Sequence, residues 1–260
     1  MGGGAFLVRA NATTGAAVQA KLIPGSMDVF GVAINGTHIA VVGQHTSAIA
    51  VDACNLVPAP NSADAMILDL LTTTLACQWS KHFGDSGDDN TATTKSVAAY
   101  PGGGWVIVGN FRGSILLADS GTFLTSRGDF DVFAGRFAAN GTHIWSFRYG
   151  NTGFDLGESV AVTPEGNAVF AGSFDASITF GSITVNGVNN VFVTRMTAGD
   201  TPTHEWAVGL GGDDSDQGES VALGADGTVY VLGQFNGMTT VAGTPFTSQA
   251  EDAWIASLVR

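Results

Sequence analysis

Apolar residues occur in short runs along this chain, and glycine or Asn-Gly pairs separate the runs where the backbone would have to reverse. Short apolar runs bounded by turn residues are typical of β-strands. Residues 159–162 and 168–172 form one predicted hairpin around a turn at 164–167, and Asn35-Gly36 marks an equivalent turn. No stretch of ten or more residues carries a convincing helical period. The pattern therefore predicts an all-β protein with almost no helix.

The strand pattern itself repeats four times. An acidic residue precedes the first strand of each repeat, at Asp28, Asp89, Asp155 and Asp216, so the intervals are 61, 66 and 61 residues. Periods of this length are typical of solenoids and of propeller blades. Each repeat contains four predicted strands. The repeats cover about residues 24–83, 84–149, 150–210 and 211–260, the last completed by 5–23.

Four short antiparallel strands repeated radially predict a β-propeller, in which each blade covers the faces of its neighbours. Before the first complete repeat, residues 5–9 and 17–22 match the third and fourth strand positions of a repeat. The last repeat ends with its third strand, at 253–259. We expect the strand at 17–22 to complete the last repeat in a mixed N- and C-terminal blade. Residues 1–260 then form a single four-bladed domain. One third strand is surplus in that ring, so the alternative is an open arc of a larger propeller.

The repeats also share short motifs in a fixed order. The first motif is two glycines and an aspartate, and it precedes a strand that ends in Val-Tyr-Val-Leu-Gly. A later strand begins with Asp or Asn before Val-Phe, and a tryptophan follows that strand. The motif residues are Gly211, Gly212, Asp216, 228–233, 131–137, 190–196, Trp145 and Trp206. This order resembles the bacterial SBBP-type β-propeller repeat over nearly the whole chain, although Gln19 stands at one tryptophan position. The resemblance implies a propeller fold and an extracellular or cell-surface setting, and it implies no activity.

Composition limits the classes of partner. Hydrophobic residues make up 45% of the 260 residues, yet no run approaches the ~20 residues of a membrane span. The chain has 23 Asp and Glu against 10 Lys and Arg, for a net charge of −13. Nucleic acids and anionic membranes are bound through clustered basic side chains. We therefore expect no nucleic-acid partner and no membrane insertion, and an extracellular protein whose signal peptide is absent from this chain.

Catalytic motifs are missing from the sequence. Gly84-Asp85-Ser86-Gly87 matches the surroundings of a serine-protease nucleophile, but the same repeat position reads GNTG and GGDD elsewhere, so Ser86 has no special status. The chain contains no GxSxG, HExxH, CxxC or phosphate-binding loop. We predict that the protein is not an enzyme and assign no catalytic residues.

Acidic residues cluster in the loops that join one repeat to the next. Ca²⁺ takes about six to eight oxygen ligands, and such loops could supply several. None of them has the spacing of an EF-hand, and an aspartate at a turn can instead accept backbone N–H bonds. We predict the turn-capping role and no cofactor, with Ca²⁺ binding as the alternative. The candidate calcium ligands are Asp85, Asp88, Asp89, Asp213, Asp214 and Asp216.

One tryptophan recurs in the predicted fourth strand of three repeats, at Trp79, Trp145 and Trp206. Exposed aromatic side chains repeated in this way could stack on sugars, as in propeller lectins. Alternate apolar residues on a strand are also what a packed face between two sheets contains. We predict packing between blades, with glycan binding by these three residues as the alternative.

Two cysteines, Cys54 and Cys77, lie in the first complete repeat. A bond between them would close a loop of just over twenty residues and contribute about 3 kcal/mol. Two cysteines do not make a disulfide framework, so the bonded and the reduced forms both remain open. Asn11, Asn35 and Asn140 stand in Asn-x-Thr sequons at predicted turns, where a glycan could be attached.

These observations predict a non-enzymatic, extracellular or cell-surface β-propeller that acts as a structural or protein-interaction module. Segments that differ in sequence while the framework repeats are expected to form the recognition surface. They are residues 46–63, 113–130, 175–189 and 236–251. A lectin-like propeller that binds a glycan or Ca²⁺ is the alternative. We expect a monomer if the ring closes, and a homodimer if the surplus edge strand recruits a second copy.

Overall fold

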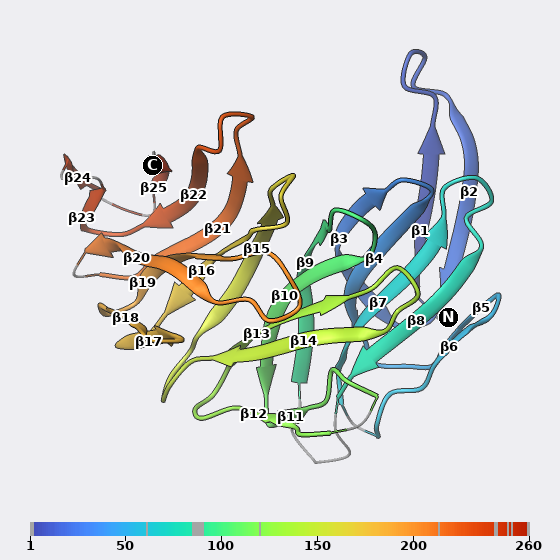
Figure 1. Cartoon of the computed structure of the whole chain (residues 1–260), viewed down its shortest axis with the longest axis horizontal. Coiled ribbons are helices and arrows are strands. Elements are labelled where there is room, and N and C mark those ends of the chain that lie inside the picture. Colours follow the sequence, from blue (N-terminus) through green and yellow to red (C-terminus); the bar gives the residue numbers. More distant parts are fainter. Residues whose placement is uncertain are drawn as a thin grey trace.

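The structure is a computed structural model, and it describes residues 3–60, 62–84, 91–119, 121–212, 214–241, 244–248, 250 and 252–258. Every regular element in the described residues is a β-strand (Figure 1), which confirms the all-β prediction.

Three antiparallel sheets follow one another along the chain, each with four main strands in sequence order, and β23 (Met238–Val241) and β24 (Thr244–Thr247) extend the third sheet to six strands by pairing with its last strand. Sheet one contains β3 (Met27–Asn35), β4 (His38–His45), β7 (Asp64–Leu71) and β8 (Cys77–Phe83). Sheet two contains β9 (Thr91–Ala99), β10 (Trp105–Arg112), β13 (Asp131–Phe137) and β14 (His143–Tyr149). Sheet three contains β15 (Leu156–Val162), β16 (Ala168–Phe174), β19 (Asn190–Met196) and β20 (His204–Gly212). The prediction of four antiparallel strands per repeat is confirmed for these three repeats.

The two ends of the chain form smaller units. The N-terminal hairpin consists of β1 (Gly4–Ala10) and β2 (Ala17–Pro24), and sheet four consists of β21 (Asp216–Leu223), β22 (Val229–Phe235) and β25 (Asp252–Leu258). The expected mixed blade is not formed, because among the described residues β2 pairs only with β1 and β25 pairs only with β22. Figure 1 shows the hairpin and sheet four at opposite sides of the molecule. Hydrogen bonds from Arg9 and Gln19 to residues 72–74 hold the hairpin against sheet one, away from β25.

A short hairpin is inserted between the second and third strands of each sheet. The inserted hairpins are β5 (Ile49–Val51) with β6 (Cys54–Leu56), β11 (Ser114–Ile115) with β12 (Leu124–Thr125), β17 (Ser177–Phe180) with β18 (Ile183–Asn186), and β23 (Met238–Val241) with β24 (Thr244–Thr247). They lie within the four segments of variable sequence. The first and third of them pack on the fourth strand of their own sheet, β6 against β8 and β18 against β20.

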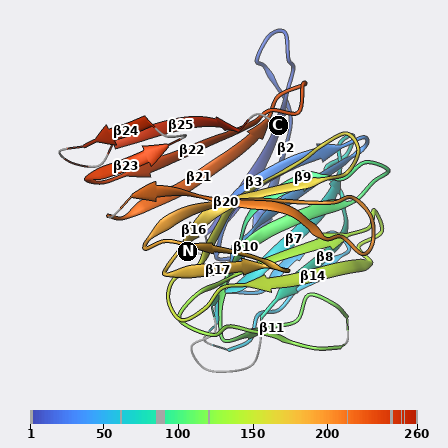
Figure 2. The ribbon, with the colours of Figure 1, turned by 60° about the vertical axis from the view of Figure 1, so that its left-hand side comes forward.

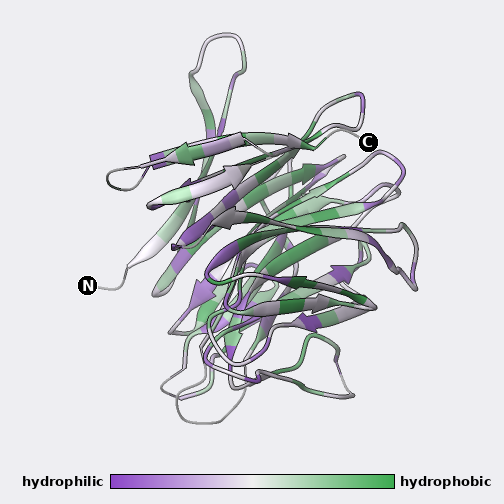
Figure 3. Ribbon diagram, turned by 90° about the vertical axis from the view of Figure 1, so that its left-hand side faces the viewer, coloured by the Kyte–Doolittle hydropathy of each residue, from purple (hydrophilic) through white to green (hydrophobic). Residues whose placement is uncertain are grey.

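The sheets stack face to face with apolar layers between them. The first strands β3, β9, β15 and β21 form a row in which each strand contacts the next (Figures 1 and 2). Separate buried clusters fill the junctions between sheets one and two, two and three, and three and four. Hydrophobic residues accordingly follow the stacked strands (Figure 3).

Glycines in the second strands have a steric cause. A Cβ atom on Gly109 would lie 2.0 Å from the carbonyl oxygen of Thr93, and one on Gly172 would lie 1.9 Å from that of Leu156. Both glycines face a β-bulge in the neighbouring first strand. The extra residue of a bulge pushes backbone toward its partner strand, so only glycine fits there.

A disulfide joins Cys54 on β6 to Cys77 on β8. It ties the first inserted hairpin to the fourth strand of sheet one, and both sulfur-bearing residues are buried. The bond closes a loop with a sequence separation of 23 residues.

Replacing both cysteines by serine is expected to lower the free energy of unfolding by about 3 kcal/mol, because the unfolded chain loses the constraint of the closed loop. Urea unfolding followed by circular dichroism measures the change. Reductant should lower the wild-type midpoint and leave that of the double variant where it is. Equal midpoints for the two oxidised proteins would contradict the expectation.

Candidate interaction site

The third and fourth strands of successive units carry an opposed pair of polar or tryptophan residues at the same register position. The two members face each other directly in the register, one residue before a β-bulge, so their side chains lie on one face. The pairs are Arg9 with Gln19, Asp69 with Trp79, Arg136 with Trp145, and Arg195 with Trp206. A side-chain N–H donor therefore recurs at one place in four successive units.

The donors bind the turn between the third and fourth strands of the next sheet. In the N-terminal hairpin, Gln19 Nε2 donates to the carbonyl of Thr74 (2.8 Å) and Arg9 Nη1 donates to that of Thr72 (2.8 Å). These carbonyls belong to the turn between β7 and β8. We call a contact of this kind, from an opposed pair to the turn of the following sheet, a turn latch.

Sheets one and two form the next two turn latches. Trp79 Nε1 donates to the carbonyl of Ala139 (2.9 Å), in the turn between β13 and β14. Arg136 Nη1 donates to the carbonyl of Gly199 (3.1 Å), in the turn between β19 and β20. The Arg136 guanidinium also lies 3.6 Å from the ring centroid of Tyr100, whose hydroxyl accepts the Gly199 N–H (3.0 Å). Trp79 packs against the buried cluster between sheets one and two, and Trp145 belongs to the cluster between sheets two and three. Glycan binding by the tryptophans stays a prediction.

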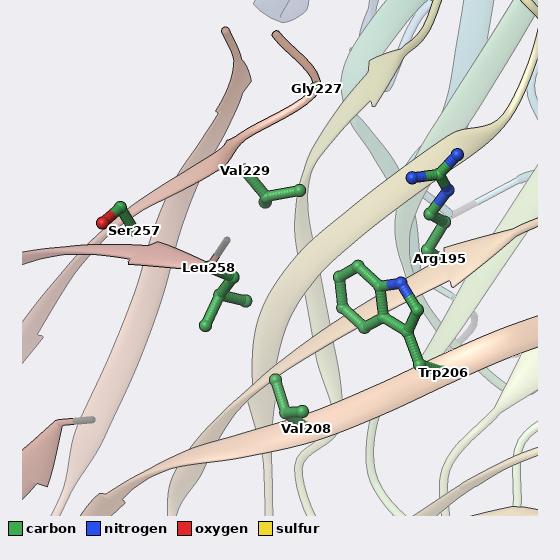
Figure 4. Close-up of a pocket in the computed structure, with 7 residues that line it drawn as sticks. All are labelled: Arg195, Trp206, Val208, Gly227, Val229, Ser257 and Leu258. Carbon is green, nitrogen blue, oxygen red and sulfur yellow. The ribbon is translucent and has the colours of Figure 1, made fainter. Parts of the chain in front are cut away.

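The fourth pair, Arg195 and Trp206, has no turn over it in the described part of the chain. The two residues border a cavity of about 400 Å³ between sheets three and four. Figure 4 shows them on one side of this cavity, with Val229 and Leu258 across from them. The Nε atom of Arg195 lies 2.8 Å from the Glu205 carboxylate. We call this cavity the socket. The socket has an apolar wall and the N–H donors of an indole and a guanidinium. Such donors can bind the carbonyl oxygens that a backbone turn leaves without partners.

The turn of the N-terminal hairpin is the counterpart of the socket. Residues 11–16 join β1 to β2, and the Asn11 side chain accepts the N–H groups of Thr13 (2.9 Å) and Thr14 (3.0 Å). All six residues are exposed. Within the described residues, no donor from another sheet reaches the carbonyls of this turn, whereas the equivalent turns of sheets one to three each accept a turn latch.

Both end faces of the stack expose apolar side chains. Val32 and Ile34 on β3 are 61% and 64% exposed, and Ile255 on β25 and Leu232 on β22 are 71% and 44% exposed. By contrast, β16 in sheet three is buried at every residue. Contiguous exposed apolar surface of this kind is typical of interaction sites.

The candidate calcium ligands do not form one described cluster. Asp85, Asp88, Asp89 and Asp213 lie outside the described residues, as does Ser86. Asp214 is exposed, whereas Asp216 is buried and accepts the N–H of Gly212 (2.7 Å). Asp155, at the equivalent position, accepts the N–H of Asn151 (2.8 Å). These two aspartates have the geometry of turn caps, and calcium binding by the acidic loops stays a prediction.

Burial raises the pKa of the Asp155 carboxyl from 3.8 to about 6, although the Asn151 N–H bond acts in the opposite direction. The neighbouring Asp131 carboxylate adds to the upward shift. The side chain of Asp155 has no exposed surface, and its Oδ1 has no partner among the described residues. The carboxylate form of this group is therefore disfavoured in the folded protein.

A second cluster, which the sequence analysis does not single out, contains His45, Asp64 and His82. One nitrogen or oxygen atom from each lies within 4.8 Å of those of the other two. The residues come from β4, β7 and β8, so strand register alone brings them together. The sequence holds one signal for the cluster, because the other repeats have phenylalanine at the position of His45. Those residues are Phe111, Phe174 and Phe235.

Compared with known proteins, the chain matches no family model and no curated sequence. The resemblance to SBBP-type repeats therefore stays a prediction from the motifs. Among the described residues there is no helix long and apolar enough to cross a membrane. Function has to be inferred from the geometry of the turn latches, the socket and the end faces.

Replacing Asp155 by asparagine is expected to flatten the dependence of stability on pH. The folded protein holds a proton on Asp155 to a higher pH than the unfolded chain, so the contribution of Asp155 to stability falls as the pH rises from about 4 to about 6. Asp155→Asn keeps an oxygen for the Asn151 N–H and removes the charge. It should gain of the order of 2 kcal/mol relative to wild type between about pH 4 and about pH 7.

Urea unfolding at the two pH values measures this difference. Asp129→Asn, at an exposed position, is the matched control and should follow the wild type. Parallel pH profiles for Asp155→Asn and the wild type would show that the Asp155 carboxyl does not carry the effect.

Proposed function

We propose that this protein is a non-enzymatic, extracellular or cell-surface structural and interaction module built from SBBP-type repeats, and that its copies associate head to tail. One observation carries the proposal. The turn latch is made at the sheet junctions inside the chain and is left open at both ends. Among the described residues, no turn of this kind contacts Arg195 and Trp206 at one end, and no donor from another sheet reaches the turn at 11–16 at the other.

The finer fold that we propose is an open arc of a β-propeller. The first strands of the four sheets form a contiguous row, whereas inserted hairpins lie against the fourth strands on the opposite side. Sheets that are close at one edge and separated at the other form wedges, and radially repeated wedges are the propeller arrangement. The disulfide between Cys54 and Cys77 is compatible with the extracellular location that we propose.

In the proposed association, β2 of a second copy adds to the open edge of β25. An exposed strand edge presents unpaired N–H and C=O groups that can pair with another chain. The turn at 11–16 precedes β2, as the turn between the third and fourth strands precedes every fourth strand. With β2 antiparallel to β25, this turn lies at the Leu258 end of β25, beside the socket. One sheet then contains β21, β22 and β25 of one copy and β2 and β1 of the next, because β2 keeps β1 on its other edge.

This arrangement continues the series of turn latches across the boundary. Arg195 and Trp206 of the first copy donate to the turn at 11–16 of the second copy. Arg9 and Gln19 of the second copy already donate to the next turn in their own chain. The exposed faces become covered at the same time, because the outer face of sheet four meets the exposed face of β3.

The interface is heterologous, since different surfaces of the two copies meet. Such an interface closes into a ring if the rotation per copy permits, and otherwise it extends into a filament. The variable inserted hairpins stay at the periphery in either case. We propose that they recognise protein partners, with the stacked sheets as their rigid support.

A glutamate on either end face is expected to abolish self-association. Ile34→Glu alters the face of β3 and Ile255→Glu alters the face of sheet four, and both positions are exposed in the single chain, so folding is retained. An unpaired charge buried in the interface should raise the dissociation constant at least about tenfold. Sedimentation velocity over a wide range of protein concentration measures the change. The wild type should associate, and each variant should remain a monomer.

Mixing the two variants gives the sharpest test of the head-to-tail geometry. The Ile34→Glu copy keeps a functional sheet-four face and the Ile255→Glu copy keeps a functional β3 face, so the mixture should form a one-to-one heterodimer. Val188→Glu, at another exposed apolar position, should associate like the wild type. A wild-type monomer at all concentrations, as in a ring closed within one chain, would overturn the proposal. So would a mixture that stays monomeric.

A further inference from the structure

The first repeat differs from the others at one buried position. The second-strand residue that faces the first residue of the third strand is His45 in sheet one and phenylalanine in sheets two, three and four. All four side chains are buried, with His45 at 0% exposure. An imidazole in a core position has to satisfy two ring nitrogens, because an unpaired buried polar group is costly.

Only one nitrogen of His45 is satisfied by the protein. His45 Nδ1 lies 2.9 Å from the carbonyl oxygen of Ser47, which can only accept, so Nδ1 carries the proton. The other nitrogen, Nε2, therefore presents a lone pair. It is buried and has no hydrogen-bond partner among the described residues.

Asp64 and His82 lie in front of this lone pair. Asp64, 1% exposed, is the register partner of His45 on the next strand, and His82 Nδ1 lies 2.9 Å from Asp64 Oδ2. The Ser62 hydroxyl donates to Asp64 Oδ1 (2.7 Å). The two imidazole rings are 5.5 Å apart at an interplanar angle of 61°. Three metal-ligand atoms thus converge from three adjacent strands.

Sheet two has a different solution at the same place. Asp131 occupies the position of Asp64, Phe111 that of His45, and Arg148 that of His82. There the Arg148 guanidinium forms an ion pair with the Asp131 carboxylate. In sheet one, His45 and His82 stand where sheet two has phenylalanine and arginine. Asp64 therefore has no permanently charged guanidinium beside it and faces two imidazole rings instead.

We propose that His45, Asp64 and His82 bind a divalent transition-metal ion of the Zn²⁺ class. Imidazole nitrogens with one carboxylate suit Zn²⁺, and a three-residue set leaves a fourth position for water. The Ser47 carbonyl and the Ser62 hydroxyl hold the ligands from behind, as outer-shell partners of metal ligands do. Ca²⁺ and Mg²⁺ are poor occupants because they prefer oxygen ligands.

The ion takes the place of the proton between His82 Nδ1 and Asp64 Oδ2. The neutral imidazole of His82 then carries its proton on Nε2 in place of Nδ1, so Nδ1 and the Asp64 carboxylate both present lone pairs to the ion. The side chain of His82 is 36% exposed, which gives the ion a route from solvent. Because the ligands lie on β4, β7 and β8, the bound ion cross-links three strands of sheet one and should raise its stability.

Calorimetric titration of the full chain with ZnCl₂ tests the proposal, with millimolar Mg²⁺ present to occupy the acidic surface. We expect one zinc ion per chain. His45→Phe inserts the residue that the other three repeats carry, so the fold is retained, and zinc affinity should fall at least about a hundredfold. Ser62→Ala removes the outer-shell bond to Asp64 together with the contact to the Ala59 carbonyl, and it should cost about tenfold. His143→Gln is the matched control, because His143 also has a buried Nε2 without a partner among the described residues.

Wild-type affinity for zinc in His143→Gln, together with its loss in His45→Phe, supports the assignment. Absence of saturable one-to-one binding by the wild type would overturn it. Equal affinity in the wild type and in a His45→Phe protein with an unchanged circular dichroism spectrum would do the same. Asp64→Asn is an independent test, because it keeps the shape of the carboxyl and removes its charge. It should weaken zinc binding and leave the circular dichroism spectrum unchanged, and wild-type zinc affinity in this variant would contradict the proposal.

Discussion

Burial of both faces of each sheet is the constraint on which this structure depends. A sheet with apolar side chains on both faces is stable only when another sheet covers each face. Strands β10 and β16, in the middle of the stack, are buried at nearly every residue, whereas β22 alternates between buried and exposed residues. The chain therefore has to form a series of sheets, and a series that does not close leaves two apolar ends.

The turn latch and the glycine contacts determine how the sheets stack. Each latch joins a strand pair to a turn roughly sixty residues later, so it aligns neighbouring sheets without contributing to either one alone. The bulges opposite Gly109 and Gly172 bring backbone close at the same level of each sheet. Repetition of these two devices explains why Gln19 can replace a tryptophan, since its amide supplies the same donor. The last pair, Arg195 and Trp206, borders the socket instead of a turn of this kind in the described part of the chain.

Local pattern predicted the strands well, because turn glycines and short apolar runs act within a few residues. It did not predict how the two ends pair, because β2 can join β1 or β25 and the choice depends on contacts far along the chain. The pairing of β1 with β2 occupies one edge of β2 without closing a ring, and among the described residues no strand pairs with its other edge. The histidine cluster escaped the sequence analysis for a related reason: His45, Asp64 and His82 are far apart in sequence and only the register of three strands joins them. At Asp155 and Asp216 the carboxylate accepts a backbone N–H at a turn, and calcium binding by the acidic loops stays a prediction.

Hydrogen–deuterium exchange at several protein concentrations tests the central claim most directly, because it reports on the edge strands themselves. If the open edge of β25 is completed by β2 of another copy, amide protection in both strands should increase with concentration, while strands of sheet two should not change. Exchange in β2 and β25 that is independent of concentration would contradict the claim that the ends of the stack complete one another.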